Sequence, residues 1–487
     1  MTPFVITICV LGLSSVAWAV FKICTIYNYW KNRKVHTLKP QFPFGNSKNA
    51  FLQRMPLGFD VYELYTEIKS RSERYGGYYN FTIPVFIPAD LQLIKAILIT
   101  NSDCFINRVS HFDVENDPLT ANLLHSRGAH WKRMRSKTSP FFGNVQLKPF
   151  FPFVIRKTDE LVKSIAETPN ALDVREVLDR YAIDLMGLYI SGIDFKIMKN
   201  KDSDLQRQLE KFLNTSIVDT LIRFFITIPK LLKYFKIMTF KKGMTEFFMM
   251  FIDDMVQTRQ LSRSDRKVVL DALTQRTSDK FARAEIAGNV TMLFLAGYET
   301  TSTTLTFCLY ELAYNMELQE KLRAEINMLD NLSFNSVVSL TLLDKCIKET
   351  LRKYPSATII TRECTKTFHV PDSNIVLEEG SEVYIPIRGI HWDPEYYPNP
   401  QNFDPERFSE ENFRGRHPCS WLPFGAGPRH CIGSKLAIMS MKVTMVALLK
   451  HYRFRLHPKT HSPLQYNVKT FILQPENGVF LYAEKIS

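Results

Sequence analysis

Paired cysteine motifs are missing from this sequence. Its eight cysteines in 487 residues include no Cys-x-x-Cys pair, which excludes a zinc ribbon and a thioredoxin-like redox motif. Eight cysteines are also too few for a disulfide scaffold in a chain of this length. A reducing compartment is therefore the simpler interpretation.

Low-complexity composition is also absent. The 19 glycines and 25 prolines exclude collagen-like material, and 45% hydrophobic with 23% charged residues is the composition of a folded protein. The length would allow about three domains. However, there is no Gly/Ser linker, internal repeat or change of composition, so residues 47–487 are predicted to form one large domain.

The first part of the chain lacks charge. No charged side chain occurs between Met1 and Phe21, and roughly 20 apolar residues are enough to span a bilayer as a helix. The flanking aromatic and basic residues suit a membrane interface and place the remainder on the cytoplasmic side; they are Tyr27, Tyr29, Trp30, Lys31, Arg33 and Lys34. We therefore predict a membrane anchor over 1–30 and a basic, proline-containing hinge over 31–46. A cleaved signal peptide ending near Ala17–Ala19 is the alternative.

Positive charge is in excess, with 62 Lys and Arg against 49 Asp and Glu, or 62 − 49 = +13. The total alone allows nucleic acid, a membrane surface or an acidic protein as partner. Residues 224–248 mix large apolar side chains with five lysines. Such a segment lies on a membrane surface or forms core helices with solvated lysines.

Helical periodicity dominates the remainder, notably over 170–198 and 202–218, with strand-like stretches near 78–87, 375–387 and 454–486. The fold class is therefore mainly α with a minor β component. A long, nearly uncharged helix is predicted over 284–314. Because it contains Glu299, and a carboxylate is costly at the centre of a bilayer, we interpret it as a buried central helix and not as a second membrane span.

One loop indicates a cofactor. In the ten-residue segment Phe424–Gly433, Cys431 lies just before a predicted helix, where free backbone N–H groups and the helix dipole lower the pKa of a thiol and favour a thiolate ligand. The glycines allow a flat prosthetic group to approach the backbone, and Arg429 could pair with a carboxylate of that group.

This loop resembles the haem-binding signature of the cytochrome P450 superfamily. Three further segments resemble family motifs in the same order: the oxygen-binding segment Ala296–Thr301, the pair Glu349 and Arg352 at i, i+3 spacing, and the PERF segment within Phe403–Phe408. The resemblance covers essentially the whole chain. It is greatest to microsomal, membrane-anchored members, including insect enzymes that metabolise xenobiotics and hormones.

The resemblance implies a P450 fold holding haem b, with Cys431 as the axial ligand of the iron and Thr300 with Glu299 positioning the waters that deliver protons to bound dioxygen. The resemblance also implies two further sets of residues. One set contacts the haem and comprises Phe424, Gly433, Arg429, Trp131, Arg135 and Arg362, with Arg108 left open. The other forms a buried structural network and comprises Glu349, Arg352 and Arg407.

The implied activity is insertion of one atom of dioxygen into a lipophilic substrate, such as a xenobiotic, insecticide, steroid hormone or fatty acid. Electrons would come from NADPH through a separate NADPH–cytochrome P450 reductase, with cytochrome b5 as a second donor, and nucleic acid is no longer an expected partner. The expected location is the endoplasmic reticulum membrane, with the catalytic domain facing the cytosol. The reductase, an acidic flavoprotein, would dock on a basic patch around the cysteine face. In the alternative interpretation these charges are scattered and only keep the surface soluble. The patch is Lys132, Arg133, Lys137, Arg414, Arg416 and Lys435.

Two alternatives remain. A haem-thiolate isomerase or dehydratase of lipid peroxides would need no proton relay, so Glu299 and Thr300 count against it. A non-enzymatic haem-based ligand binder is disfavoured by the same intact segment, although less strongly.

Overall fold

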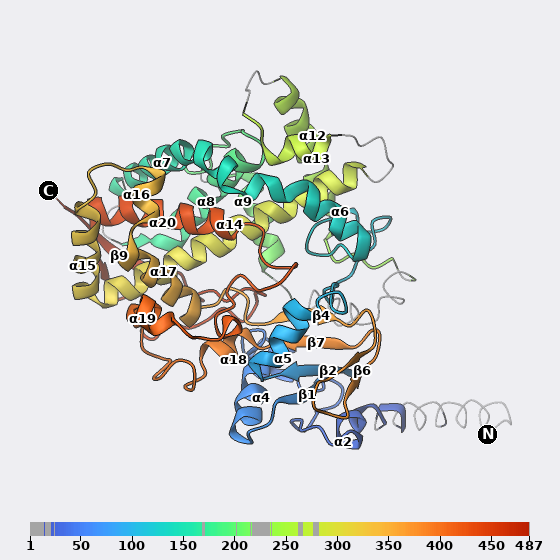
Figure 1. Cartoon of the computed structure of the whole chain (residues 1–487). Coiled ribbons are helices and arrows are strands. Elements are labelled where there is room, and N and C mark those ends of the chain that lie inside the picture. The colour runs from blue at the N-terminus through green and yellow to red at the C-terminus, as the bar shows by residue number, and fades with distance from the viewer. Residues whose placement is uncertain are drawn as a thin grey trace, which may run out of the picture.

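Helices make up most of the computed structural model (Figure 1), which describes residues 14, 21–23, 25–167, 171–200, 202–214, 216, 234, 236–261, 266–275 and 282–486. Most of the predicted anchor over 1–30 lies outside these residues, as do positions 217–233 and 235 of the segment around 224–248. Within the part of the chain that is described, no helix has both the length and the apolar character needed to cross a bilayer.

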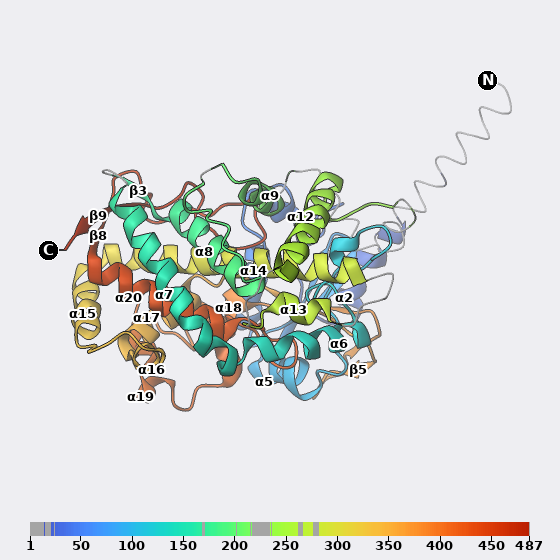
Figure 2. The ribbon, with the colours of Figure 1, turned by 90° about the horizontal axis from the view of Figure 1, so that it is seen from above.

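The main helical part contains the longer helices (Figure 2), with α14 running through its middle. These are α6 (Gly128–Thr138), α7 (Asn144–Ala166), α8 (Val174–Ile190), α9 (Asp204–Leu213), α12 (Lys242–Leu261), α13 (Val269–Thr274), α14 (Ala282–Tyr314), α15 (Met316–Asn327), α16 (Phe334–Val338), α17 (Thr341–Lys353) and α20 (Ser434–His451). The helices that lie elsewhere are α2 (Tyr29–Asn32), α3 (Lys48–Phe51), α4 (Phe59–Ser70), α5 (Leu91–Lys95), α18 (Ile387–His391) and α19 (Glu410–Phe413).

Three small sheets complete the fold. The largest has the order β1-β2-β7-β4, from β1 (Tyr75–Asn80), β2 (Ile83–Pro88), β7 (Glu382–Ile385) and β4 (Ile360–Glu363). The second has the order β3-β9-β8, from β3 (Leu172–Asp173), β9 (Phe480–Lys485) and β8 (Tyr452–Leu456); the third pairs β5 (Phe368–His369) with β6 (Val376–Leu377). The prediction of a mainly α fold with a minor β component is confirmed.

Element boundaries differ from prediction where turns interrupt the pattern. The single strand expected over 78–87 is the antiparallel pair β1 and β2. The stretch 375–387 supplies β6 and β7 to two different sheets, because the turn at 378–381 separates them. The helix expected over 170–198 is α8, which ends at Ile190, whereas the central helix is found over Ala282–Tyr314 close to its predicted bounds.

The central helix packs tightly against α8. A Cβ atom added to Gly297 would lie 2.4 Å from the Met186 side chain of α8, so a larger residue here would require the Met186 side chain to move. Most of α14 is buried, as expected of a helix that is apolar on most faces. This contact fixes the position of the segment Ala296–Thr301 in the molecule.

The last residue of the predicted anchor and the hinge that follows it belong to the packed body. Trp30 is 1% exposed, and its indole Nε1 donates to the Tyr78 carbonyl over 3.0 Å. A Cβ on Gly77 would lie 2.2 Å from the indole, so glycine there makes room for Trp30. The predicted hinge pairs with β1 through Thr37 and Gly77. Trp30 is thus a core residue and not part of an aromatic membrane belt.

The described part of the segment around 224–248 also packs into the body. Phe240, Met244 and Phe248 are buried, whereas Lys241 and Lys242 are exposed. For residues 236–248 this matches core helices with solvated lysines, and not a surface that lies on a membrane.

Candidate active site

A cavity of about 830 Å³ separates the Cys431 loop from α14. Cys431, Phe424 and Gly433 contribute one wall, and residues 296–297, 300–301 and 304 of α14 contribute another. Further lining residues come from the segments 108–111, 123–125, 238–241, 356–362 and 470–472 and from α3, α4, β1, α6, α8 and α9. The sequence motifs for the cofactor loop and the central helix therefore meet at one site.

Glycines determine the shape of the Cys431 loop. Gly425 and Gly427 both have φ of +69°, and a Cβ on Gly427 would lie 1.8 Å from the Leu98 carbonyl oxygen. The Cys431 backbone N–H donates to the Phe424 carbonyl over 2.8 Å and closes the loop. Gly433 differs, because a Cβ there would meet no described atom closer than 3.9 Å.

The thiol of Cys431 faces the cavity, but its pKa is higher than the sequence suggests. Burial raises this pKa above its ordinary value. The backbone N–H groups of Gly433 and Ser434, together with the nearby Arg108 and Arg135, lower it by a smaller amount. The helix terminus thus acts in the predicted direction, but desolvation outweighs it in the protein alone.

Four arginines line the cavity beside Cys431: Arg108, Arg135, Arg362 and Arg429. Burial, with mutual repulsion second, lowers the pKa of Arg429 to about 8 and that of Arg362 to about 9. Burial likewise lowers the pKa of Arg108 to about 10, although the Cys431 thiolate opposes this. Such a concentration of buried cations calls for an anionic partner.

Arg429 also joins two loops. Its guanidinium donates to the carbonyls of Ile106, Leu123 and Ser126 over 2.7, 3.1 and 2.6 Å, and lies 4.1 Å above the Trp131 ring. Arg429 thus holds the loop 106–126 against the cofactor loop, a role that its sequence position did not indicate.

The other predicted contact residues lie close by. Arg135 donates to the His430 carbonyl over 3.0 Å, and Arg108 donates to the Arg429 carbonyl over 3.1 Å. Arg362, which is 2% exposed, donates to the Thr361 carbonyl. A cavity-facing thiol, a glycine loop and buried cations together fit a flat prosthetic group with carboxylate substituents.

Thr300 and Glu299 point in different directions from α14. Thr300 lines the cavity, and its hydroxyl donates to the Ala296 carbonyl over 2.7 Å. Glu299 is fully buried and is not among the residues that line the cavity. The two neighbours in sequence are therefore not brought together at the cavity wall.

Two side chains from distant segments and one from the next turn of α14 hold Glu299 instead. Its Oε1 accepts from the Arg175 guanidinium, from Gln474 Nε2 over 2.7 Å and from Thr303 Oγ1 over 3.1 Å. Its Oε2 is buried and has no partner among the described residues. Burial raises the pKa of Glu299, and Arg175 opposes that rise. Arg175 and Gln474 lie in no motif, so no sequence pattern points to them.

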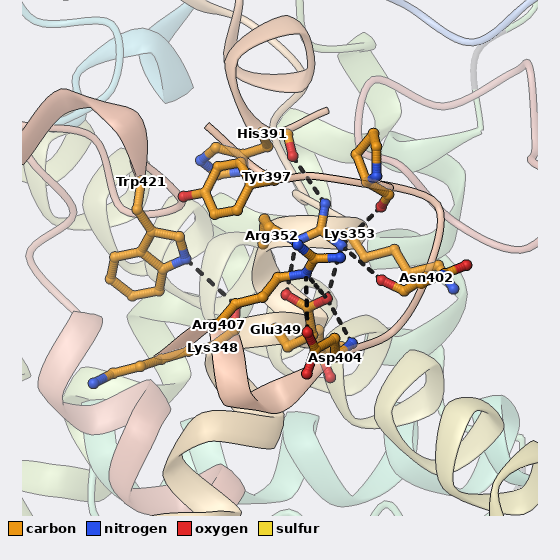
Figure 3. A network of polar contacts seen from close by, with 12 residues as sticks. Lys348, Glu349, Arg352, Lys353, His391, Tyr397, Asn402, Asp404, Arg407 and Trp421 are labelled. Atoms are coloured by element: carbon orange, nitrogen blue, oxygen red, sulfur yellow. Dashed lines mark hydrogen bonds and ion pairs between the residues drawn. The ribbon is translucent and has the colours of Figure 1, made fainter. Parts of the chain in front are cut away.

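The predicted network of Glu349, Arg352 and Arg407 is buried beneath the cofactor loop (Figure 3). Arg352 binds both carboxylate oxygens of Glu349, at 2.7 and 2.8 Å, and Arg407 Nε lies 3.4 Å from Oε1. Arg352 and Arg407 also donate to the carbonyls of Pro400, Asn402 and Asn399. The network therefore ties α17 to the segment 399–407.

His391 extends this network toward Cys431. Its carbonyl accepts from Arg352 over 2.9 Å, and its ring Nε2 accepts from the Leu422 backbone N–H over 2.8 Å. Burial lowers the pKa of His391 to about 3, with Arg352 adding to the effect, so the ring is neutral. Leu422 is two residues before Phe424. His391 was not predicted as a site residue, because no local sequence pattern connects it to Leu422.

Known proteins with similar sequences support the same kind of site. The cytochrome P450 family model matches residues 55–482. The chain is 32% identical over 475 residues to "Probable cytochrome P450 6a13" of Drosophila melanogaster, and 31% identical over 481 residues to "Cytochrome P450 6A1" of Musca domestica; both alignments cover 94% of each chain. It is 30% identical over 488 residues to "Cytochrome P450 6k1" of Blattella germanica, covering 93% of this chain and 92% of that one.

A haem-thiolate site is thus what both the cavity and the relatives define. The chain belongs to the cytochrome P450 family. Its activity is that of a haem-thiolate monooxygenase, with haem bound through a cysteine thiolate and electrons supplied by a redox partner.

Proposed function

We propose that the cavity between Cys431 and Thr300 is where this monooxygenase oxidises a lipophilic substrate. The observation that carries the proposal is that both side chains line one cavity of about 830 Å³, a size suited to a drug-sized molecule. Most of its remaining walls are apolar, including Phe142, Leu293 and Phe471. Xenobiotics, insecticides, steroid hormones and fatty acids all match such walls.

Haem, when bound here, supplies the activation of dioxygen. We assign its thiolate ligand to Cys431. The carboxylates of the haem would be held by the buried arginines Arg108, Arg135, Arg362 and Arg429, with Trp131 beneath the Arg429 guanidinium. The loop closed by Phe424 and ending at Gly433 fixes the position of the thiol.

Thr300 would hold protons at the cavity, and Glu299 would supply them from behind the helix. The Thr300 hydroxyl donates to the Ala296 carbonyl, which leaves its oxygen free to accept from a water in the cavity. Glu299 is held by Arg175 and has a free Oε2. For Glu299 to take part, its side chain must turn or a water must bridge the two residues.

Replacing Thr300 with Ala tests this arrangement. With the hydroxyl gone, protons arrive less efficiently, and a larger share of the NADPH consumed should appear as hydrogen peroxide. The matched control is Thr304→Ala, one turn along α14 and also at the cavity. Equal peroxide per NADPH in wild type, Thr300→Ala and Thr304→Ala would refute the role of Thr300.

The electron donor in this proposal is NADPH–cytochrome P450 reductase, with cytochrome b5 as a second donor. Four residues of the predicted basic patch are exposed: Lys132, Arg133, Arg414 and Lys435. Arg133 and Arg414 already form ion pairs, with Glu285 and Glu410. The other two members are also engaged, since Lys137 donates to the Leu273 carbonyl and Arg416 lies 4.9 Å above the Tyr397 ring. The docking surface is therefore smaller than predicted.

Charge reversal tests the docking surface. Lys132→Glu and Lys435→Glu should slow reduction by purified reductase, most strongly at low salt, because like charges reduce the association rate. Lys459→Glu, an exposed lysine just after β8, is the control. Unchanged rates in the first two variants would show that the reductase docks elsewhere.

We also propose that the apolar N-terminal stretch anchors the enzyme in the endoplasmic reticulum membrane, with the catalytic domain in the cytosol. The support is its sequence, with no charge between Met1 and Phe21. Because Trp30 is a core residue, the informative deletion removes residues 1–24 and keeps Trp30. The truncated enzyme should leave the membrane fraction while retaining haem. Full retention in that fraction would assign membrane binding to another surface.

A further inference from the structure

A second polar corner lies in the cavity, apart from the four arginines, and borders its apolar walls. His111 and His125 both line it, and both lie in the segment between α5 and α6. The side chains around them include Val109, Phe240 and Met244. Two imidazoles in such surroundings call for an explanation, because a buried polar group without a hydrogen bond is costly.

Asn122 fixes the tautomer of His125. The Asn122 side-chain Nδ2 donates to the Leu119 carbonyl over 2.6 Å, so its Oδ1 is the acceptor. That Oδ1 receives the backbone N–H groups of Leu124 and His125, at 2.9 and 3.0 Å. It also lies 3.0 Å from His125 Nδ1. Since an amide oxygen only accepts, Nδ1 must carry the proton, and Nε2 of the neutral ring is an acceptor.

The neutral state of His125 is secure. Burial, with the nearby Arg108 and His111 contributing less, lowers its pKa to about 3. The Phe240 ring packs edge-on against the imidazole at 5.8 Å between centroids. Asn122 and Phe240 therefore hold the ring in place, and no described residue gives Nε2 a hydrogen bond.

His111 provides an independent observation beside it. The residue is 4% exposed, and its Nε2 is buried with no hydrogen-bond partner among the described residues. Burial lowers its pKa, and Asp113 opposes the shift. Buried nitrogens without partners are rare in folded proteins and mark places where a water or ligand completes the bonding.

We propose that His125, oriented by Asn122, is a specificity-determining residue whose Nε2 accepts a hydrogen bond from a hydroxyl group of the substrate. His111 is the second polar contact at the same corner. The preferred substrate class is then a lipophilic alcohol or phenol and not a plain hydrocarbon. The inference rests on the proposed use of this cavity as the substrate site.

The discrimination follows from the unpaired nitrogen. A substrate hydroxyl gives Nε2 a partner, whereas the analogue that lacks the hydroxyl covers Nε2 without giving it one. One neutral hydrogen bond of this kind corresponds to about ten-fold in affinity. The remaining apolar walls bind both molecules equally.

Two probe ligands test the proposal: biphenyl-4-ol and biphenyl, which differ by one hydroxyl. Their dissociation constants are measured on the holoenzyme by calorimetry, which reports binding without turnover. Wild type should bind biphenyl-4-ol about ten-fold more tightly. His125→Leu should bring the ratio close to one, and His125→Gln, which restores an acceptor oxygen, should recover part of it. His451→Leu, on the exposed end of α20, should leave the ratio unchanged.

The outcomes separate the two proposals. Equal affinity of wild type for both ligands, or a ratio that survives His125→Leu in a variant that still holds haem, would overturn the role of His125 alone. Failure of either ligand to bind wild type would overturn the cavity as a lipophilic substrate site, and the role of His125 with it.

Discussion

Two sets of buried polar groups lie on either side of the Cys431 loop: the network of Glu349, Arg352 and Arg407 below it, and the groups around the cavity above it. They are buried to a similar degree but are paired very differently. Below, Glu349 has two guanidinium partners and the Asp404 backbone N–H at 2.9 Å. Above, the buried carboxyl groups Asp60 and Glu382 are held by tyrosine hydroxyls, from Tyr78 at 2.5 Å and Tyr384 at 3.1 Å.

This difference separates structural from functional burial. A carboxylate with opposite charges and further hydrogen bonds acts as a fixed support. Burial raises the pKa of Asp60 to about 6 and that of Glu382 to about 7, because tyrosines offset only part of the desolvation. Asp60 and His111 line the cavity, where a bound ligand changes their surroundings, and Glu382 lies beside the cavity-lining Tyr384.

The largest expected effect is a loss of stability in the network of Glu349, Arg352 and Arg407. Glu349→Gln leaves Arg352 buried without a counter-charge and Arg407 with only the half-exposed Asp404 at 3.9 Å. This should cost about 3–5 kcal/mol of unfolding free energy and lower the haem content. Urea unfolding and haem absorbance measure the two effects. Glu410→Gln, in an exposed pair with Arg414, is the control and should change little. A Glu349→Gln enzyme as stable as wild type would remove the contrast between the two regions.

The next effect is a pH dependence on the cavity side. Because the folded state raises the pKa of Glu382 from 4.5 to about 7, it binds the proton more tightly than the unfolded chain. Stability from this group is therefore lost as pH rises between these values. From pH 5 to pH 8, Glu382→Gln should gain roughly 2–3 kcal/mol relative to wild type.

Urea unfolding at the two pH values measures this gain, with the exposed Glu379→Gln as control. A constant difference between Glu382→Gln and wild type at pH 5 and pH 8 would mean that Glu382 is ionised throughout. The contrast with Glu349 would then no longer hold.

The smallest effect concerns the link between the network and the loop. His391→Leu removes the acceptor for the Leu422 N–H and should cost about 1–2 kcal/mol, together with a broadened carbonyl-complex band. His391→Gln can present an acceptor oxygen near Nε2 and should restore both properties in part. If His391→Leu matches wild type in unfolding midpoint and band shape, His391 does not position the loop.

Local spacing was sufficient to predict much of the site. The Cys431 loop, the central helix and the pair Glu349 and Arg352 depend on residues close in sequence, and the structure places each of them as a unit. The motifs also predicted the mainly helical fold. Their roles toward haem and dioxygen stay predictions.

Contacts between distant segments were not predictable. Arg175 and Gln474 are 124 and 175 residues from Glu299, and neither lies in a motif. The motif alone placed Glu299 beside Thr300 at the cavity, but successive residues on a helix point about 100° apart, and the ion pair with Arg175 holds Glu299 on the far side. Trp30 is a similar case, since the space that Gly77 leaves for it is visible only after folding.

The assignment of Cys431 as the thiolate ligand is the central claim, and the carbon monoxide spectrum of the reduced enzyme tests it most directly. Wild type and Cys104→Ser, a partly exposed cysteine outside the cavity lining, should both give the thiolate-type Soret band. Cys431→Ser should lack it, even in preparations that retain haem. A thiolate-type band of full intensity in Cys431→Ser would contradict the account.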